Sequence, residues 1–442
     1  MKAFRADWVC PASGPPLRNA ALLVSGDRIA GVGSPVPTDA PVEDFSGCAI
    51  IPGFVNAHIH LELTLLRGFL ENLAFGEWIR TLTRTRYERM DREDLVVSAR
   101  LGAVECLRAG VTTVGEVMDL GTGWEAMSEA GLRGVAYQEV FGPRREDAGG
   151  RAAALEEKIG ALRTVSGGTG LRRLGVSPHA PYTVSDALYR RVRDLAARMD
   201  LPVAVHIGES AAEGRFVRCG DGPFADSWKS RDIPVEARGV GPLAYLDQLG
   251  LCGARTLAIH AIDASADDIG RLRETDTAVA HCPKSNLKLG HGIAPLREFL
   301  DAGLRVGLGT DSVASNNAVD MFEEMRVAVF LQRTRLGDPR ALAASEAFSL
   351  ATLGGARCLG LDAEVGSLEA GKVADFVVVD LGDPALQPVY DPVEAMVFSA
   401  SRHNVRATFL GGERVRVDTD DAEALVREAG ARARRLAGHD PA

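Results

Sequence analysis

Long apolar runs and an excess of positive charge are both missing from this sequence. Its 442 residues carry 50 Lys and Arg against 60 Asp and Glu, a formal net charge of −10. Nucleic-acid-binding surfaces are usually basic, so we expect no nucleic-acid partner. No segment approaches the roughly 18 uncharged apolar residues that a membrane helix needs, so we expect no membrane partner either.

Cysteine pairs and a signal sequence are missing as well. The chain has seven cysteines, an odd number, and none is arranged as C-x-x-C. This usage fits a reduced compartment better than a disulfide framework, and we interpret the cysteines as small buried hydrophobic residues. The first residues, MKAFRADWVCPASGPP, have an early lysine but no apolar core, which is not typical of a signal peptide. The sequence therefore predicts a cytoplasmic protein.

The middle of the chain alternates short apolar or β-branched runs with helical patterns. Helices are expected at 93–109, at 185–199 with Ser185 as N-cap, from Ser265 onward, and at 320–335. The expected strands are 54–60, 111–116, 134–140, 173–178, 202–207, 255–260, 277–281 and 304–310. Eight strands alternating with helices over about 250–300 residues predict an α/β fold, a (β/α)8 barrel of the TIM type. A doubly wound parallel sheet is the competing arrangement.

Both ends of the chain have a different pattern, with short strands and no intervening helices. Examples are AALLVSGDRIAGVG near the start and VRATFLGGERV near the end. We expect the two ends to assemble one small composite β-sandwich, followed by a surface helix at 420–438. The expected segments are 1–52 for the first part of the sandwich, 53–363 for the barrel, and 364–442 for the second part with the helix.

Histidines gather at the ends of the expected strands. In PGFVNAHIHLELTLLRG, residues 52–68, His58 and His60 are two apart, so a strand aims both imidazoles at one point. The chain has only nine histidines. Six of them are expected at strand ends: His58, His60, His179, His206, His260 and His281. Asp311 follows the eighth strand, and barrel enzymes build their sites at this rim.

The residue types in this group suit a catalytic metal site. Imidazole and carboxylate ligands with one open position are typical of catalytic zinc, and Fe²⁺ would also be accommodated. We predict that His58, His60, His206 and Asp311 bind one zinc ion per chain. A bound water would then have a pKa near 7, so that hydroxide is available at neutral pH.

Two further residues of the rim have the chemistry for catalysis. Glu209 follows His206 by three residues, so it can reach the water and the substrate without binding metal. A glutamate there suits proton transfer from the water to a leaving nitrogen. His260 either orients the water or polarises the atom under attack. Alternatively, His260 is a fifth metal ligand.

These motifs resemble the amidohydrolase superfamily, in its branch of aminohydrolases and chlorohydrolases. The similar stretches are IPGFVNAHIH, HIGE, HCPKSNLKLG, GTDSVASNN and GSLEAGKVADFVVVD, which span nearly the whole chain in order. The resemblance implies a mononuclear site on the four ligands above, with catalytic roles for Glu209, His260 and Asp311. No lysine ends the fourth strand, where two-metal members carry a carboxylated one, and His179 nearby favours one metal.

Within the branch, the chain resembles deaminases of 5′-modified adenosines. NLKLGHGIAPL resembles methylthioadenosine and S-adenosylhomocysteine deaminases, whereas HLEL and QEVFGP resemble aminodeoxyfutalosine deaminases. The resemblance implies that Trp78 packs on the nucleoside and that His179 contacts purine or ribose. Gln138 stands where the first group has an arginine, and Tyr87 replaces an acidic ribose contact. Further expected substrate contacts are Glu209, His281 and Arg151.

The sequence therefore predicts a metal-dependent deaminase that releases ammonia from an adenine-type ring. Among substrates, aminodeoxyfutalosine is placed before methylthioadenosine, and both before S-adenosylhomocysteine, because a guanidinium in the early loops suits a carboxylate-bearing tail. Alternatives are a deaminase of a free base such as guanine or 8-oxoguanine, and a triazine-type chlorohydrolase. A non-catalytic binding protein would lack a ligand or the general acid, and this chain lacks neither. Both a monomer and a homo-oligomer stay open.

Overall fold

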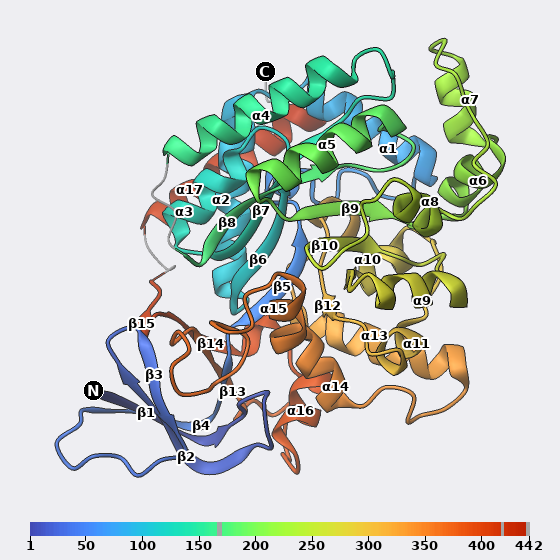
Figure 1. The fold of residues 1–442 in the computed structure, drawn as a ribbon. Helices are drawn as coiled ribbons and strands as arrows, with labels where there is room; N and C mark the ends of the chain where they lie inside the picture. Colours follow the sequence, from blue (N-terminus) through green and yellow to red (C-terminus); the bar gives the residue numbers. More distant parts are fainter. Residues whose placement is uncertain (166–169, 417–419, 439–442) are drawn as a thin grey trace.

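Two β-sheets organise the chain in the computed structural model, which describes residues 1–165, 170–416 and 420–438. The larger sheet has eight strands and is surrounded by helices, and the smaller has seven strands and lies below it in Figure 1. The strands of the larger sheet are β5 (Phe54–Ile59), β6 (Val111–Met118), β7 (Arg133–Val140), β8 (Arg172–Pro178), β9 (Val203–Ile207), β10 (Thr256–His260), β11 (Ala278–His281) and β12 (Val306–Leu308).

The eight-stranded sheet is the predicted barrel. Its strands follow one another in chain order and every neighbouring pair is parallel. The amide of Asp311, just after β12, donates to the carbonyl oxygen of His58 in β5 at 2.9 Å, which links the last strand to the first. A doubly wound sheet would reverse its strand order at a switch point, and this sheet does not.

Helices cover the outside of the barrel, and the predicted helices are all present. The helices are α1 (Phe75–Glu88), α2 (Arg92–Arg108), α3 (Thr122–Ala130), α4 (Ala148–Val165), α5 (Asp186–Met199), α6 (Ala211–Cys219), α7 (Pro223–Lys229), α8 (Pro242–Gln248), α9 (Ala266–Glu274), α10 (Pro283–Lys288), α11 (Leu296–Asp301), α12 (Val313–Asn316), α13 (Met321–Leu336), α14 (Ala344–Ser349), α15 (Gly355–Cys358), α16 (Pro392–Ser399) and α17 (Asp420–Ala437). Short helical turns lie at Leu61–Leu66, Leu350–Gly354 and Arg402–Asn404. Ser185 and Ser265 accept the backbone N–H groups of Leu188 and Asp268, the N-cap geometry expected from the sequence.

The smaller sheet is built from both ends of the chain, as predicted. Its strands are β1 (Lys2–Val9), β2 (Leu17–Ser25), β3 (Arg28–Val32), β4 (Val42–Pro52), β13 (Phe376–Asp380), β14 (Val405–Leu410) and β15 (Glu413–Arg414). They pair in the order β15-β14-β13-β4-β1-β2-β3. The expected segment 364–442 includes residues 417–419 and 439–442, which lie outside the described residues.

Both faces of this sheet are apolar, which explains how it joins the barrel. Val377 and Val379 of β13 belong to the large core that includes the barrel helices, whereas Phe376 and Val378 belong to a separate core of the small sheet. Successive residues of a strand point to opposite faces, so one strand serves both cores. The rings of Phe4 and Phe376 pack edge to face in the separate core, with centroids 4.8 Å apart.

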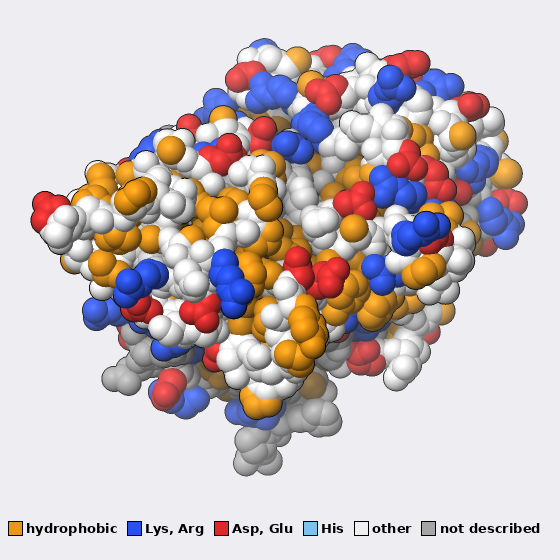
Figure 2. Space-filling model, turned by 90° about the horizontal axis from the view of Figure 1, so that it is seen from below, with side chains coloured by type: hydrophobic (Ala, Val, Ile, Leu, Met, Phe, Trp, Pro, Cys, Tyr) orange, Lys and Arg blue, Asp and Glu red, His pale blue; other side chains and the backbone are white. Residues whose placement is uncertain are grey.

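The surface of the described chain mixes both charge signs. Figure 2 shows Lys and Arg side chains interspersed with Asp and Glu on the face seen from below. Among the described helices, none is long and apolar enough to cross a membrane.

Candidate active site

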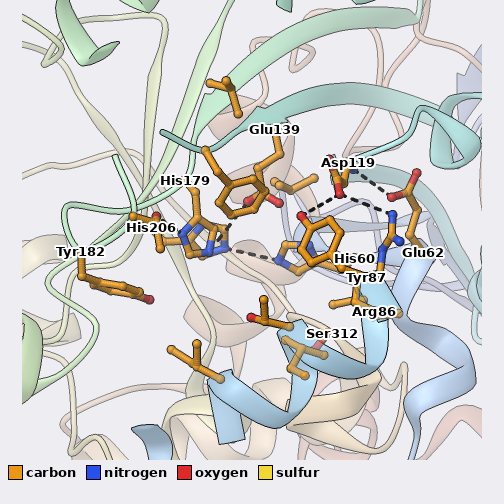
Figure 3. A pocket seen from close by; sticks show the side chains of 18 of the residues that line it. His60, Glu62, Arg86, Tyr87, Asp119, Glu139, His179, Tyr182, His206 and Ser312 are labelled. Carbon is orange, nitrogen blue, oxygen red and sulfur yellow. Dashed lines mark hydrogen bonds and ion pairs between the residues drawn. The ribbon is translucent and has the colours of Figure 1, made fainter. Parts of the chain in front are cut away.

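One cavity of about 650 Å³ opens where the barrel strands end. His60, His206, His260 and Asp311 all line it, and they come from the residue after β5, from β9, from β10 and from the loop after β12. Parallel barrel strands end at one rim, so residues far apart in the sequence meet there. Figure 3 shows His60 and His206 side by side in this cavity.

The predicted ligand residues converge on a single point. Nε2 of His60 lies 3.3 Å from Nε2 of His206, and Oδ1 of Asp311 lies 3.3 Å from Nε2 of His58 and 3.6 Å from Nε2 of His60. Two overlapping sets, His58–His60–His206 and His58–His260–Asp311, each have possible ligand atoms within 4.8 Å of one another. Three imidazoles and one carboxylate oxygen in this arrangement are typical of a zinc or iron site.

The ionisation of these histidines also fits a metal ion. Burial lowers the pKa of His58, lowers the pKa of His60 to about 4, and lowers the pKa of His206 well below its usual value. Neighbouring imidazoles lower the last two further. The rings are therefore neutral at pH 7, and neutral imidazole is the form that ligates metal.

Asp311 is held so that its Oδ1 faces the histidines, and the same oxygen also accepts the backbone N–H of Ser312 at 2.6 Å. Its Oδ2 accepts hydrogen bonds from the hydroxyls of Ser285 at 2.6 Å and Ser315 at 2.8 Å. Burial would raise the pKa of Asp311, but its hydrogen bond to His58 and the neighbouring histidines hold it well below the usual value. Asp311 also has a φ of +58°, a conformation that costs a non-glycine residue about 1 kcal/mol or more and is common at functional sites.

Glu209 is buried beside this group and points into the same cavity. Its carboxylate accepts a hydrogen bond from the Tyr182 hydroxyl at 3.3 Å and lies 3.7 Å from Nε2 of His260. Burial, together with the charges of Asp311 and Glu213, raises its pKa well above the usual value for a carboxyl group. A carboxyl group with a raised pKa is suited to taking up and releasing a proton near neutral pH.

His260 is oriented from behind by an amide. Its Nδ1 lies 2.9 Å from Oδ1 of Asn286, which assigns the proton to Nδ1 and leaves Nε2 facing Glu209 as an acceptor. Burial lowers the pKa of His260 to about 4, so the ring is neutral. His260 has a φ of +76°, a second strained residue at this rim.

His291 is a residue of this site that sequence reasoning missed. Its Nδ1 lies 3.6 Å from Oε1 of Glu209, and its ring packs edge to face on Phe75 at 4.2 Å. The signal was its place in NLKLGHGIAPL, a stretch already used for the family resemblance. His291 comes from a loop after α10, and loop paths do not follow from strand periodicity.

The model of the Amidohydrolase family matches residues 49–415, which is most of the chain. The chain belongs to the amidohydrolase family. This confirms the resemblance that the strand-end motifs indicated.

Among members of this family, two curated relatives match almost the full length. The 5-methylthioadenosine/S-adenosylhomocysteine deaminase of Moorella thermoacetica is 34% identical over 434 residues, covering 95% of this chain and 96% of that protein. The 5′-deoxyadenosine deaminase of Methanothermobacter thermautotrophicus is 35% identical over 418 residues, covering 93% and 92%. A solved adenosine deaminase from Xanthomonas campestris with bound zinc has a TM-score of 0.84 at 32% identity, covering 99% of this chain and 98% of that one.

Four of the predicted substrate contacts of this amidohydrolase line the cavity, and Glu209, described above, is one of them. The other three are Trp78, His179 and Arg151. The ring of His179 lies between those of Phe141 and His206, with centroid distances of 4.9 and 4.8 Å. Their roles toward a substrate stay predictions.

Gln138 and His281 do not reach the cavity, contrary to expectation. Gln138 is buried on the other face of β7, where its amide donates to the carbonyl oxygens of Met118, Asp119 and Glu139 at 3.3, 2.6 and 3.2 Å. Alternate residues of a strand face opposite sides, so the neighbouring Glu139 lines the cavity instead. His281 is 1% exposed at the end of β11 and is not part of the cavity wall.

An acidic group in the cavity wall was also missed. It consists of Glu62, Asp119 and Glu139. Figure 3 shows Asp119 and Glu62 close to Arg86 and Tyr87, on the far side of His60 from His206. Glu62 lies in the helical turn Leu61–Leu66, Asp119 in the loop after β6 and Glu139 in β7, and the sequence carried no spacing signal that would join them.

The cysteines are mostly buried, as expected, with one correction. Cys282 is fully buried and burial raises the pKa of its thiol well above the usual value, which fits a packing residue rather than a nucleophile. Cys219, at the end of α6, is exposed, and Cys252 is half-buried. The expectation that all the others are buried was therefore wrong for these two.

Proposed function

We propose that this amidohydrolase is a metal-dependent hydrolytic deaminase of 5′-modified adenosines. The observation that carries the proposal is the meeting of two groups in one cavity. His58, His60, His206 and Asp311 converge as a ligand set, and Glu209 lies next to them with a raised pKa. The proposed complement is one Zn²⁺ or Fe²⁺ per chain on these four residues.

The reaction that this set supports is the replacement of an amino group by water. A divalent ion bound there would supply Lewis acidity and lower the pKa of a water molecule. Glu209 accepts a proton as the water oxygen attacks the ring carbon, and then delivers it to the amino nitrogen. The carbon–nitrogen bond breaks and ammonia leaves. His260 accepts a hydrogen bond from the attacking water through Nε2, since its Nδ1 is bonded to Asn286.

The cavity supports a purine nucleoside with a small or apolar 5′ substituent. Phe75, Trp78, Ile79, Leu82 and Leu155 give its wall a largely apolar character. The similar proteins are named as deaminases of methylthioadenosine, S-adenosylhomocysteine and 5′-deoxyadenosine. We therefore place 5′-deoxyadenosine and methylthioadenosine first.

A carboxylate-bearing tail fits this cavity less well. The buried Arg86 and the exposed Lys158 are both engaged by Asp119, whose carboxylate lies 3.4 Å and 3.9 Å from them. The other two arginines of the wall, Arg151 and Arg231, are exposed at its edge. This order reverses the sequence-based one, which placed aminodeoxyfutalosine first.

A substrate panel tests the proposal. Ammonia release and kcat/KM are measured for 5′-deoxyadenosine, methylthioadenosine, S-adenosylhomocysteine, aminodeoxyfutalosine, adenosine, guanine and 8-oxoguanine. We expect the first two to have the highest kcat/KM. A free base that exceeds every nucleoside by more than about tenfold, or roughly 1.4 kcal/mol of transition-state binding, would overturn the nucleoside assignment.

Two smaller proposals complete this assignment. We propose a cytoplasmic location, supported by seven cysteines that are all unpaired. We also propose the segment boundaries 1–52, 53–363 and 364–442, supported by the position of the seven-stranded sheet on both sides of the barrel strands in the chain.

A further inference from the structure

Glu139 is a buried carboxylate in the cavity wall that the reaction above does not use. It precedes the last residue of β7 and is 8% exposed. Its Oε1 is buried and has no hydrogen-bond partner among the described residues. An unsatisfied buried polar atom destabilises a protein, so such atoms usually have a partner that the protein alone does not supply.

The two neighbouring acids are already satisfied by the protein. The carboxylate of Glu62 accepts the backbone N–H groups of Asp119 at 2.8 Å and Thr122 at 2.9 Å. The carboxylate of Asp119 accepts the Tyr87 hydroxyl at 2.8 Å and lies 3.4 Å from Arg86. Of these three acids, only Glu139 has its hydrogen-bonding capacity left for a ligand.

A second acceptor lies next to Glu139. The Thr183 hydroxyl donates its proton to the carbonyl oxygen of Ala180 at 3.1 Å, so it accepts from Nδ1 of His179 at 2.7 Å. Nδ1 therefore carries the ring proton, and Nε2 is an acceptor. Nε2 lies 3.9 Å from Oε1 of Glu139, which places two acceptors side by side in the wall (Figure 3).

These two adjacent acceptors would be matched by two adjacent hydrogen-bond donors on the substrate. The proposed substrates have few hydrogen-bond donors. The adenine ring donates only through its amino group, which is the group that leaves at the metal end. In a 5′-deoxy or 5′-thio nucleoside the 5′ hydroxyl is absent. The remaining donors are the 2′ and 3′ hydroxyls of ribose, which sit on neighbouring carbons.

We infer that Glu139 is a specificity-determining residue that accepts hydrogen bonds from the 2′,3′-diol of the ribose. The inference rests on the proposed nucleoside substrate. Possible ligand atoms of Glu139, His179 and His206 lie within 4.8 Å of one another. The proposed ribose contact is therefore next to His206, one of the four proposed metal ligands. Burial, with the charges of Asp119 and Glu62, raises the pKa of Glu139, and either protonation state keeps an acceptor oxygen.

A comparison of two substrates across variants tests this contact. Adenosine and 2′,3′-dideoxyadenosine differ only in the diol. For the wild-type protein we expect kcat/KM to favour adenosine by about 10²-fold or more, since a site built to bind hydroxyls rejects an analogue that lacks them. In Glu139→Ala the preference should fall below about tenfold, through loss on adenosine while dideoxyadenosine changes little. Glu139→Gln keeps one acceptor oxygen and should give an intermediate preference, which also covers the case in which the alanine variant does not fold.

Glu88→Gln is the matched control. Glu88 is an exposed acid at the end of α1 outside the cavity wall, and its removal should leave the adenosine preference unchanged. An unchanged preference in both Glu139 variants would overturn the inference, and so would loss of the preference in Asp119→Asn alone. A metal content that falls from two to one per chain in Glu139→Ala would instead assign Glu139 to a second metal. If the wild-type protein deaminates no nucleoside at all, that result overturns the proposed function and, with it, the inference about Glu139.

Discussion

Among single residues, His206 and Asp311 have the least freedom to change. Their ligand atoms belong to a group in which the imidazoles are neutral and His58 and His206 are buried, so a lost ligand is not readily replaced by solvent. We predict that His206→Ala and Asp311→Ala each lose metal and activity together. Elemental analysis checks this, with one metal per chain expected in the wild-type protein. A stoichiometry near two would contradict the mononuclear site.

Glu209 can be tested separately from the ligands, because its replacement should lower kcat without changing the metal content. Replacing it with glutamine keeps the shape and the possible contact with Tyr182 but removes the proton carrier. We predict that Glu209→Gln retains its metal and loses about 10²–10⁴-fold in kcat. Steady-state kinetics with metal analysis on the same sample checks this. Near-normal turnover would remove Glu209 from the mechanism.

Among the elements, the start of α6 determines where Glu209 lies. The carboxylate of Glu213, in the first turn of α6, accepts the backbone N–H groups of Gly208 and Glu209, both at 2.8 Å. Ser210 caps the same helix by accepting the N–H of Glu213 at 3.2 Å. The turn between β9 and α6 is therefore fixed by side chains of the helix itself.

Glu213→Ala should loosen this turn without touching the metal ligands. We predict a fall in kcat of about 10²-fold, the usual effect of misplacing a catalytic group by about 1 Å, with metal content unchanged. Glu213→Gln keeps one acceptor oxygen and should recover part of the loss. Arg215→Ala is the control, because Arg215 pairs with Asp221 on the exposed side of α6. A kcat for Glu213→Ala equal to that of the control would show that the turn holds its shape without the carboxylate.

For the whole molecule, the join between barrel and small sheet depends on a buried ion pair. Nε of Arg133, at the start of β7, donates to Asp375 at 3.1 Å, and the Asp375 side chain is only 2% exposed. Asp375 also accepts the N–H of Gly411 at 2.7 Å, next to the turn between β14 and β15. One carboxylate thus links the barrel to two strands of the small sheet.

We predict that Arg133→Ala lowers the free energy of unfolding by about 3 kcal/mol, because it leaves a buried carboxylate without its cation. Burial already raises the pKa of Asp375, and the substitution should raise it further. A carboxyl group whose pKa is higher in the folded than in the unfolded protein lowers the free energy of unfolding as the pH rises above the unfolded-state pKa. The fall in the free energy of unfolding should therefore be larger at pH 8 than at pH 5. Urea unfolding at both pH values measures it.

Arg100→Ala is the comparison for that measurement. Arg100 and Glu129 form an exposed pair, with side chains 48% and 51% exposed, and such pairs contribute about 0.5 kcal/mol or less. Equal losses in the two variants would contradict a special role for the buried pair. The kcat of folded, metal-loaded Arg133→Ala should equal that of the wild type, since Arg133 starts β7 whereas the cavity lies at the other end of the strand.

The strand ends and the ligand set could be predicted from local sequence. His58 lies in β5 and His60 directly follows that strand, and His206 and His260 lie within the last two residues of β9 and β10. Parallel strands of a barrel finish at one rim, so knowing where each strand ends is enough to bring these residues together. The helix caps at Ser185 and Ser265 could also be predicted, because an N-cap depends only on the serine and the residues that directly follow it.

Other features depended on contacts between distant segments. Gln138 and Glu139 are neighbours in β7, and which of them faces the cavity depends on the register of the strand, where a shift of one residue exchanges the two faces. His291 reaches Glu209 through a loop, and its position follows from packing on Phe75.

The sequence by itself therefore determined the barrel, the small sheet from both chain ends and the meeting of the four candidate metal ligands, because these follow from periodicity and strand ends. Only the tertiary structure decided which side chains form the wall that meets the substrate. That wall is assembled from separate strands, helices and loops, and its free acceptor, Glu139, is recognised only when its neighbours Glu62 and Asp119 are seen to be satisfied.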